Sequence, residues 1–221
     1  MKKLNADRLR VAVFDWDGTL VESRTPRLWA VNRIMDQYGL PDWESTRDRQ
    51  NKYYSFMDNF PLVFGDKARE AYQKYFELYR QNFADMIKVF PGVRETLAML
   101  KNKEVKIAIM TNKDRRLLEL ELAWLFEPGC FDKVVCGHEA ARDKPYADHA
   151  AYTLEGLIDK ADITPQTVWI IGDSVLDNIC AAAVNALPVR IIGNGSEIEK
   201  IDDPSVVYFE DFSDFYRHLA D

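Results

Sequence analysis

Four short polar clusters in the sequence contain the residue types that a phosphoryl-transfer site requires. They are Asp15-Trp16-Asp17-Gly18-Thr19, Thr111-Asn112, Lys144-Pro145, and Gly172-Asp173-Ser174 with Asp177 shortly after it. Carboxylates bind hard cations such as Mg²⁺ through oxygen atoms. Lysine and hydroxyl groups stabilise the charge that spreads over a phosphoryl group during its transfer. Together the clusters predict a magnesium-dependent phosphoryl-transfer site.

Each cluster by itself also has a purely structural explanation. Asp17 and Gly18 are an ordinary turn signal. The second and fourth clusters have residue types that cap helices, and a lysine before a proline, like Lys144, is commonly a solvated surface residue. Function is favoured because all four clusters lie at or shortly after the ends of short apolar runs. Open α/β sheets bind their ligands at such strand ends.

The apolar runs themselves are typical of strands buried on both faces. They are Val11–Phe14, Val105–Met110, Lys133–Cys136, Val168–Ile171 and Val189–Ile192. Between them, apolar residues recur at helical spacing after Pro91, before Gly129 and after Pro145. Strands joined by single helices form right-handed parallel crossovers. The sequence therefore predicts an α/β fold with a doubly wound, Rossmann-like parallel sheet.

The interval between the first two expected strands breaks this alternation. Residues 24–39 indicate a helix that starts at Thr25-Pro26 and ends at Gly39, and a second helix is expected from Asp66. Residues 53–90 hold 11 of the 27 aromatic residues of the chain, and those of the second helix lie at helical spacing, as in a core. We therefore expect an α/β core of residues 1–21 and 89–221, with a small helical cap of residues 22–88.

Composition argues against several classes of protein. The formal net charge is −7, and no run of lysine or arginine marks a nucleic-acid partner. No signal peptide is expected, and no segment approaches the roughly 20 apolar residues of a membrane span. Cys130, Cys136 and Cys180 have no metal-site spacing and are expected to be buried reduced thiols. The expected location is the cytoplasm, and the sequence does not indicate an oligomeric state.

In this order, the four clusters resemble the four motifs of the haloacid dehalogenase-like superfamily. The resemblance is greatest to the phosphatase branch that includes phosphoglycolate phosphatases. The matching residues run from Asp15 to Asp177 and span the expected core. The resemblance implies Mg²⁺ as cofactor and a small phosphorylated metabolite as substrate. It also implies a phosphatase that works through an aspartyl-phosphate intermediate, with a helical cap that closes over the site and selects the substrate.

The resemblance assigns the catalytic and metal-binding roles to aspartates. Asp15 would be the nucleophile, and Asp17 would protonate the leaving alcohol and later activate water. Mg²⁺ would be held by Asp15, by the backbone carbonyl of Asp17 and by Asp173, with Asp177 supporting the site. The dehalogenases and phosphonate-cleaving enzymes of the superfamily lack an acid at the position of Asp17. Its presence here therefore indicates phosphate-ester chemistry.

Phosphate binding would fall to the remaining polar residues. Thr111 and the backbone of Asn112 would hold the phosphate, and Lys144 would neutralise it. The residues themselves suggest that the loop through Gly18 adds backbone N–H donors, because glycine allows close approach. A phosphosugar mutase uses the same intermediate, and a binding or regulatory protein could keep the fold without turnover. Both stay open as alternatives.

Some charged residues fall outside these motifs. Asp114 stands where many relatives have proline, and Glu22 stands where aspartate is common. Both lie outside the catalytic set. His138 lies near a strand end and is expected to be structural or at the rim of the site. Three arginines of the expected cap are candidate contacts for a carboxylate or phosphate, although charged residues on such helices are more often solvated. They are Arg24, Arg47 and Arg49.

Overall fold

The computed structural model of this chain describes residues 6–193 and 203–220. The strands of the main sheet are β1 (Val11–Phe14), β4 (Lys106–Met110), β5 (Lys133–Val135), β6 (Val168–Gly172), β7 (Leu187–Ile191) and β8 (Val207–Phe209). They form a six-stranded parallel sheet in the order β5-β4-β1-β6-β7-β8. With β1 near the middle, the chain builds one half of the sheet and then crosses to build the other. This confirms the predicted doubly wound α/β class.

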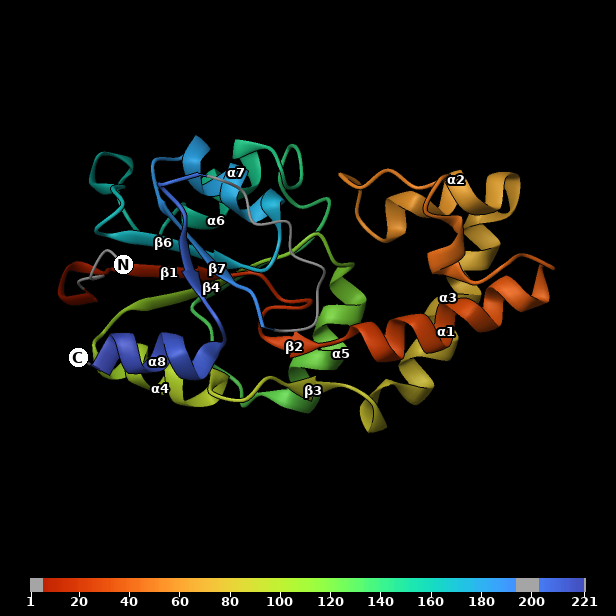
Figure 1. Cartoon of the computed structure of the whole chain (residues 1–221), viewed down its shortest axis with the longest axis horizontal. Coiled ribbons are helices and arrows are strands. Elements are labelled where there is room, and N and C mark those ends of the chain that lie inside the picture. Colours follow the sequence, from red (N-terminus) through yellow and green to blue (C-terminus); the bar gives the residue numbers. More distant parts are fainter. Residues whose placement is uncertain (1–5, 194–202, 221) are drawn as a thin grey trace.

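Helices cover both faces of this sheet (Figure 1). They are α4 (Val93–Asn102), α5 (Arg115–Leu125), α6 (Ala147–Leu154), α7 (Val175–Ala183) and α8 (Phe212–Ala220). In β1, Val11 and Val13 pack in the apolar layer of α6 and α7, whereas Phe14 packs in the opposite layer with α4 and α8. Burying one such side chain stabilises the fold by about 1.5–3 kcal/mol. A strand buried on both faces gains on each side, which explains its continuous apolar run.

The far edge of the sheet differs from the sequence expectation. The last expected strand, Val189–Ile192, begins earlier, at Leu187, and β8 was not predicted at all. Pro188 lies within β7 but precedes Val189, the first residue paired with β8. Its missing N–H therefore interrupts no pairing with β8, although proline in a sequence normally argues against a strand. The strand β8 has only three residues, too few to show a pattern.

The chain between β1 and α4 forms a helical insert beside the sheet (Figure 1). Its helices are α1 (Arg24–Gln37), α2 (Phe60–Phe64) and α3 (Ala68–Asn82), and the strands β2 (Val21–Glu22) and β3 (Lys88–Val89) pair antiparallel where the chain enters and leaves it. Short 3₁₀ turns lie at Ala6–Arg8, Trp43–Thr46, Met57–Asn59, Gly65–Lys67, Phe83–Asp85 and Lys160–Asp162. The pairing of β2 with β3 supports the division at residues 22 and 88, which stays a proposal.

Two details of the insert correct the sequence analysis. Helix α1 starts at Arg24 with Ser23 at its N-cap, so Thr25 is not the cap residue. Instead, the Thr25 N–H donates to the carboxylate of Glu22 at 3.0 Å. This contact gives Glu22 a structural role at the helix entry. Helix α2 was not predicted, because its five residues are too short for a helical period to show.

The insert has its own aromatic core, as the sequence predicts. Phe60 is 1% exposed, and its ring centroid lies 5.3 Å from those of Trp43 and Phe56 and 5.7 Å from that of Tyr75. Such ring pairs add to the hydrophobic gain of burial. No helix of the described residues is long and apolar enough to cross a membrane. The three cysteines are free thiols, and Cys130 is only partly buried.

Candidate active site

Parallel strands bring the first cluster to the carboxyl edge of the sheet. The Asp15 N–H donates to the carbonyl of Ile171 at 2.8 Å, so the hydrogen-bond ladder between β1 and β6 continues into the functional residue. Asp15 is 6% exposed. The neighbouring strand end therefore fixes the position of this carboxylate through the backbone.

A tight turn after β1 requires glycine at position 18. Gly18 has φ +83°, and a Cβ atom there would lie 2.4 Å from Oδ2 of Asp173. The Gly18 N–H donates to the carbonyl of Val21 at 2.9 Å. The visible contribution of Gly18 is therefore to let the Asp173 carboxylate approach the turn, whereas its N–H serves the turn itself.

Lys144 joins two of the clusters through buried ion pairs. Its Nζ lies 2.6 Å from Oδ1 of Asp15 and 2.8 Å from Oδ1 of Asp177. The other oxygen of Asp177 accepts from the backbone N–H and the hydroxyl of Ser174, at 3.2 and 2.6 Å, and so caps α7. Both oxygens of Asp177 are thus occupied by donors of the protein, which fits the supporting role implied for this residue.

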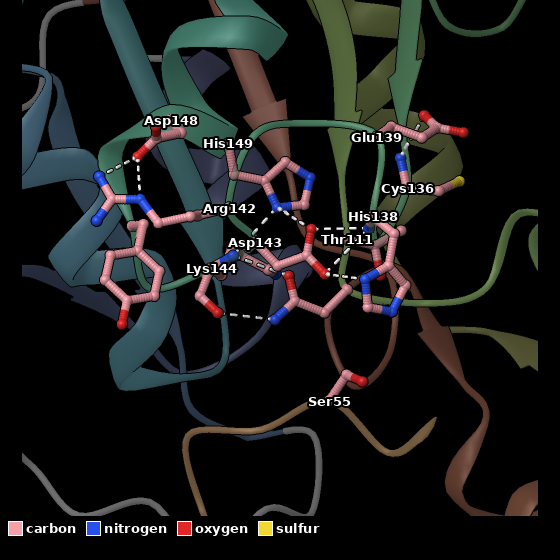
Figure 2. A network of polar contacts seen from close by, with 12 residues as sticks. Ser55, Thr111, Cys136, His138, Glu139, Arg142, Asp143, Lys144, Asp148 and His149 are labelled. Atoms are coloured by element: carbon pink, nitrogen blue, oxygen red, sulfur yellow. Dashed lines mark hydrogen bonds and ion pairs between the residues drawn. The ribbon is translucent and has the colours of Figure 1, made fainter. Parts of the chain in front are cut away.

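The loop that carries Lys144 is held by hydrogen bonds on both sides. The Asn112 side chain accepts from the Lys144 N–H at 3.0 Å and donates to the Lys144 carbonyl at 2.9 Å. The Lys144 N–H also lies 3.1 Å from Nδ1 of His149 (Figure 2). Asp143, beside it, accepts from the backbone N–H of His138. The Asn112 side chain therefore positions Lys144. The backbone of Asn112 is left for the predicted contact with phosphate.

The remaining predicted phosphate ligand lines the same small pocket. Thr111 is 1% exposed, and its hydroxyl oxygen accepts from the Lys113 N–H at 3.2 Å. A pocket of about 170 Å³ is lined by residues of all four clusters, among them Asp15, Asp17, Thr111, Lys144 and Asp173. The structure thus brings the predicted catalytic groups together.

Crowding of carboxylates marks this pocket as a place for a cation. Burial raises the pKa of Asp15 to about 8, since the carboxylates of Asp177 and Asp173 add to the effect and Lys144 only partly offsets it. Burial and Asp177 likewise raise the pKa of Asp173 to about 6. Oxygen atoms of the three carboxylates lie within 4.8 Å of one another. Three carboxylates with a single lysine beside them offer only oxygen atoms as metal ligands. This arrangement fits a divalent cation such as Mg²⁺.

Asp17 has a different electrostatic environment from Asp15. Its Oδ1 lies 2.7 Å from Nζ of Lys113 and accepts a hydrogen bond from the Ser23 hydroxyl. Burial by itself would raise the pKa of Asp17, but the cations of Lys113 and Arg27 and the two hydrogen bonds hold it below its ordinary value. The Asp17 side chain is therefore an ionised carboxylate that faces Lys113, and it is not one of the three that converge.

A buried acidic residue that the sequence analysis missed completes this network. The Glu121 carboxylate lies 2.8 Å from Nζ of Lys113 and accepts from the Trp16 indole at 2.6 Å and from the Tyr79 hydroxyl. Burial raises the pKa of Glu121. One signal was available, because Glu121 follows Leu117 and Leu118 at helical spacing on the apolar face of α5. A glutamate on a buried face needs polar partners.

Two charged residues outside the motifs, Asp114 and His138, lie close to residues of the insert. Asp114 caps α5 by accepting from the Arg116 N–H at 2.8 Å, and it accepts from the Tyr72 hydroxyl of α3 at 3.1 Å. This contact with the insert gives Asp114 a structural role. The His138 side chain is 54% exposed and lies 3.5 Å from Asp58 of the insert, so it stands at the rim.

The three candidate arginines of the insert divide into two groups. Arg24 and Arg47 line a large cavity beside the small pocket. Both pair with Glu44, at 2.5 and 3.2 Å. Arg49 is exposed and does not line that cavity. The structure therefore supports only the first two as candidates for contact with a ligand, and it adds Arg27, which lines both the cavity and the pocket.

The fold and the site define a hydrolase of the haloacid dehalogenase-like class. A family model described as Haloacid dehalogenase-like hydrolase matches residues 12–191, and the chain belongs to this family. The phosphoglycolate phosphatase of Aquifex aeolicus is 32% identical over 76% of this chain and 78% of its own length. A phosphorylated carbohydrates phosphatase of Thermotoga maritima is 26% identical over 75% and 77%. The resemblance seen in the sequence is confirmed.

Solved structures share the whole architecture, insert included. CbbY from Rhodobacter sphaeroides, solved in complex with phosphate, matches with a TM-score of 0.79. The match covers 96% of this chain and 99% of that chain, at 18% sequence identity. At this identity the likeness concerns the fold alone. It shows that the sheet and the insert together form one known arrangement.

Proposed function

We propose that this chain is a Mg²⁺-dependent phosphatase that hydrolyses a small phosphorylated metabolite through an aspartyl-phosphate on Asp15. The observation that carries the proposal is the buried group in which Lys144 contacts Asp15 and Asp177, with Asp173 beside them. The relatives named phosphatases, for phosphoglycolate and for phosphorylated carbohydrates, support this class of enzyme.

Asp15 and Lys144 would carry out the first step. A carboxylate oxygen of Asp15 attacks phosphorus, the bond to the ester oxygen breaks, and the phosphoryl group stays on Asp15 while the alcohol leaves. Lys144 and the Thr111 hydroxyl stabilise the charge on the phosphoryl oxygens. Mg²⁺ held by Asp15, Asp173 and the Asp17 carbonyl would neutralise the negative charge that Asp15 and the phosphate bring together.

Asp17 would move the protons of both steps. In its ionised form it can accept a proton from the water that attacks the aspartyl-phosphate, which releases phosphate and restores Asp15. In the first step it must give a proton to the leaving oxygen. A phosphate dianion bound beside Lys113 and Arg27 offsets the two cations that lower the pKa of Asp17. Substrate binding thus favours the protonated form that the first step needs.

Phosphate release from a panel of phosphate monoesters, with Mg²⁺ and with EDTA, tests the proposal. We expect turnover that requires Mg²⁺, and a phosphoenzyme that hydroxylamine cleaves in the wild type and that does not form in Asp15→Asn. A requirement for a sugar bisphosphate activator would identify a phosphosugar mutase instead. Absence of turnover across the panel would favour a binding or regulatory protein.

The partner of this enzyme is proposed to be a small molecule. The net charge of −7 argues against nucleic acid, and the inner pocket is sized for a phosphoryl group. A cytoplasmic location stays a prediction of the sequence. Fractionation of cells that express the chain at its native level, with detection by antibody, would check it.

A further inference from the structure

A second, larger cavity opens beside the catalytic pocket. It has a volume of about 1210 Å³, and the pocket has about 170 Å³. Ligand cavities for drug-sized molecules are typically about 300–1,000 Å³, so the large cavity has room for a substrate group beyond the phosphoryl group. Asp173 and Ser174 from the core and Arg27 from the insert line both spaces. A phosphate ester whose phosphoryl group reaches Asp15 can therefore extend past these shared residues into the large cavity.

Among the residues that the structure describes, the lining of this cavity has an excess of positive charge. Its cationic lining residues are Arg24, Arg27, Arg47, Lys52 and Arg190, and its acidic ones are Glu44 and Asp173. Glu44 pairs with Arg24 and Arg47. Within residues 6–193 and 203–220, neither Arg27 nor Arg190 forms an ion pair with a carboxylate. Arg27 lies on α1 of the insert, and Arg190 lies on β7 of the core.

Arg190 is the more unusual of the two. Only 4% of its surface is exposed. Its Nε donates to the backbone carbonyl of Asp173 at 3.2 Å, whereas its Nη1 is buried and has no hydrogen-bond partner among the described residues. A buried charge without an anionic partner is costly. A role in bracing the Asp173 loop would need Nε alone and would leave the rest of this guanidinium unexplained.

We infer that Arg190 is a specificity residue that binds a second anionic group of the substrate, a carboxylate or a phosphate, in the large cavity. Arg27 faces the same cavity from the insert and adds positive charge there. The substrates would thus be phosphate monoesters with another anionic group at the far end. Such a molecule would contact the core and the insert at once. The inference deepens the proposed function and rests on it.

Three substrates on one two-carbon frame test this inference. They are ethyl phosphate, phosphoglycolate and ethylene glycol bisphosphate, which place a methyl group, a carboxylate or a phosphate at the far end. In the wild type we expect kcat/KM to be higher for one or both of the doubly anionic esters than for ethyl phosphate. Hydrogen bonds to a charged group are worth about 1.5–3 kcal/mol, so the preference should be about 10- to 100-fold. Whichever ester gains identifies carboxylate or phosphate as the preferred group.

Arg190→Met is the decisive variant, because methionine keeps much of the buried volume without the charge. We expect the preference for the doubly anionic ester to be lost, with a drop of about 10- to 100-fold for that ester beyond any drop for ethyl phosphate. Arg49→Met is the matched control, since Arg49 is exposed and outside the cavity, and it should keep the preference. Equal losses for all three esters in Arg190→Met would overturn the inference.

Binding without turnover separates this inference from the proposed function. Calorimetric titration of the wild type with phosphonopropionate and with propylphosphonate, both in Mg²⁺, compares an inhibitor with and without the second anion. Tighter binding of phosphonopropionate is expected even if Arg190→Met does not fold. Equal affinities of the wild type for the two phosphonates would refute the second anion site. If the wild type hydrolyses no monoester but still prefers phosphonopropionate, the proposed function fails and the anion site stands.

Discussion

The α/β core and the helical insert differ in the residues that they bury and in the side chains that they present. The core buries aliphatic strands on both faces and holds its functional carboxylates through ladder hydrogen bonds and buried ion pairs. The insert buries aromatic rings and presents arginines to a large cavity. The proposed chemistry, which tolerates little displacement, lies on the strand ends of the core, and the arginines of the insert lie on a part of the chain outside the sheet. The two regions should therefore respond differently to mutation.

The largest expected effect belongs to the core. Asp15→Asn removes the attacking oxygen of the proposed mechanism for every substrate, so turnover should fall by at least about 10⁴-fold. The fold should persist, since asparagine keeps the shape of the side chain. Phosphate release and thermal unfolding together check this. Near-normal turnover of Asp15→Asn would disprove covalent catalysis by Asp15.

A second substitution lies where the two regions meet. Asp17→Asn should slow cleavage of alkyl phosphates by about 10²–10⁴-fold, because a basic alkoxide needs a proton from Asp17. An aryl phosphate, whose leaving group is weakly basic, should lose much less in its first step. Rapid-quench measurement of the phosphoenzyme burst separates that step from the slower dephosphorylation. Equal losses for both leaving groups would mean that Asp17 shapes the metal site instead of transferring protons.

A matched pair of phenylalanines sharpens the comparison of the two regions. Phe60 of the insert and Phe215 of the core are both buried, and replacement of either by alanine should cost about 3–5 kcal/mol of stability. We expect Phe60→Ala to reduce kcat/KM for the natural substrate more than for a small aryl phosphate. Phe215→Ala should lower the unfolding temperature without changing that ratio. The same change of ratio in both variants would show that the insert does not select the substrate.

The smallest expected effect is a pH dependence of stability in the core. Because the pKa of Asp15 is raised from 3.8 to about 8, the folded chain holds a proton that the unfolded chain has released, and stability falls as pH rises between these values. Burial lowers the pKa of His149 from 6.5 to about 4, an opposite effect that ends near pH 6.5. In EDTA we expect a loss of roughly 1–2 kcal/mol from pH 6.5 to 8.

Two controls isolate Asp15 in this pH experiment. Asp15→Asn should lack the loss in stability, because asparagine does not titrate. Mg²⁺ should remove the loss in the wild type, since a bound cation stabilises the ionised carboxylates. Chemical denaturation at each pH, with EDTA or Mg²⁺, gives the free energies of unfolding. An identical slope in the wild type and in Asp15→Asn would assign the titration to another group.

The sequence was sufficient to predict the fold class and to place the main site residues together. Asp15, Thr111, Lys144 and Asp173 could be placed because parallel strands bring their carboxyl ends to one edge, so position along the chain implies position in space. The same reasoning did not single out Arg190, because it lies within an apolar strand, one residue before the carboxyl end of β7, and not in a polar cluster after it. Its burial beside the cavity depends on the packing of β7 against β6 and on the path of the Asp173 loop.

The contacts of the insert with the core also could not be predicted from the sequence. Tyr79 belongs to an aromatic row whose spacing predicts only a buried face, and the structure alone shows its hydroxyl on Glu121. Likewise Lys113 follows Thr111-Asn112 directly, yet nothing local indicates that its ammonium contacts Asp17. Long side chains reach partners many residues away, and the choice of partner depends on the docking of α3 on α5.

The Glu121 carboxylate has a consequence for energetic coupling between distant parts of the chain. It accepts from Tyr79 of the insert and contacts Lys113, which in turn contacts Asp17. Thermodynamic linkage is reciprocal: if displacement of Tyr79 changes the proton affinity of Asp17, then protonation of Asp17 must change the free energy of displacing Tyr79 by the same amount. Under that condition, protonation of Asp17, the proposed catalytic acid, and the seating of the insert are thermodynamically linked.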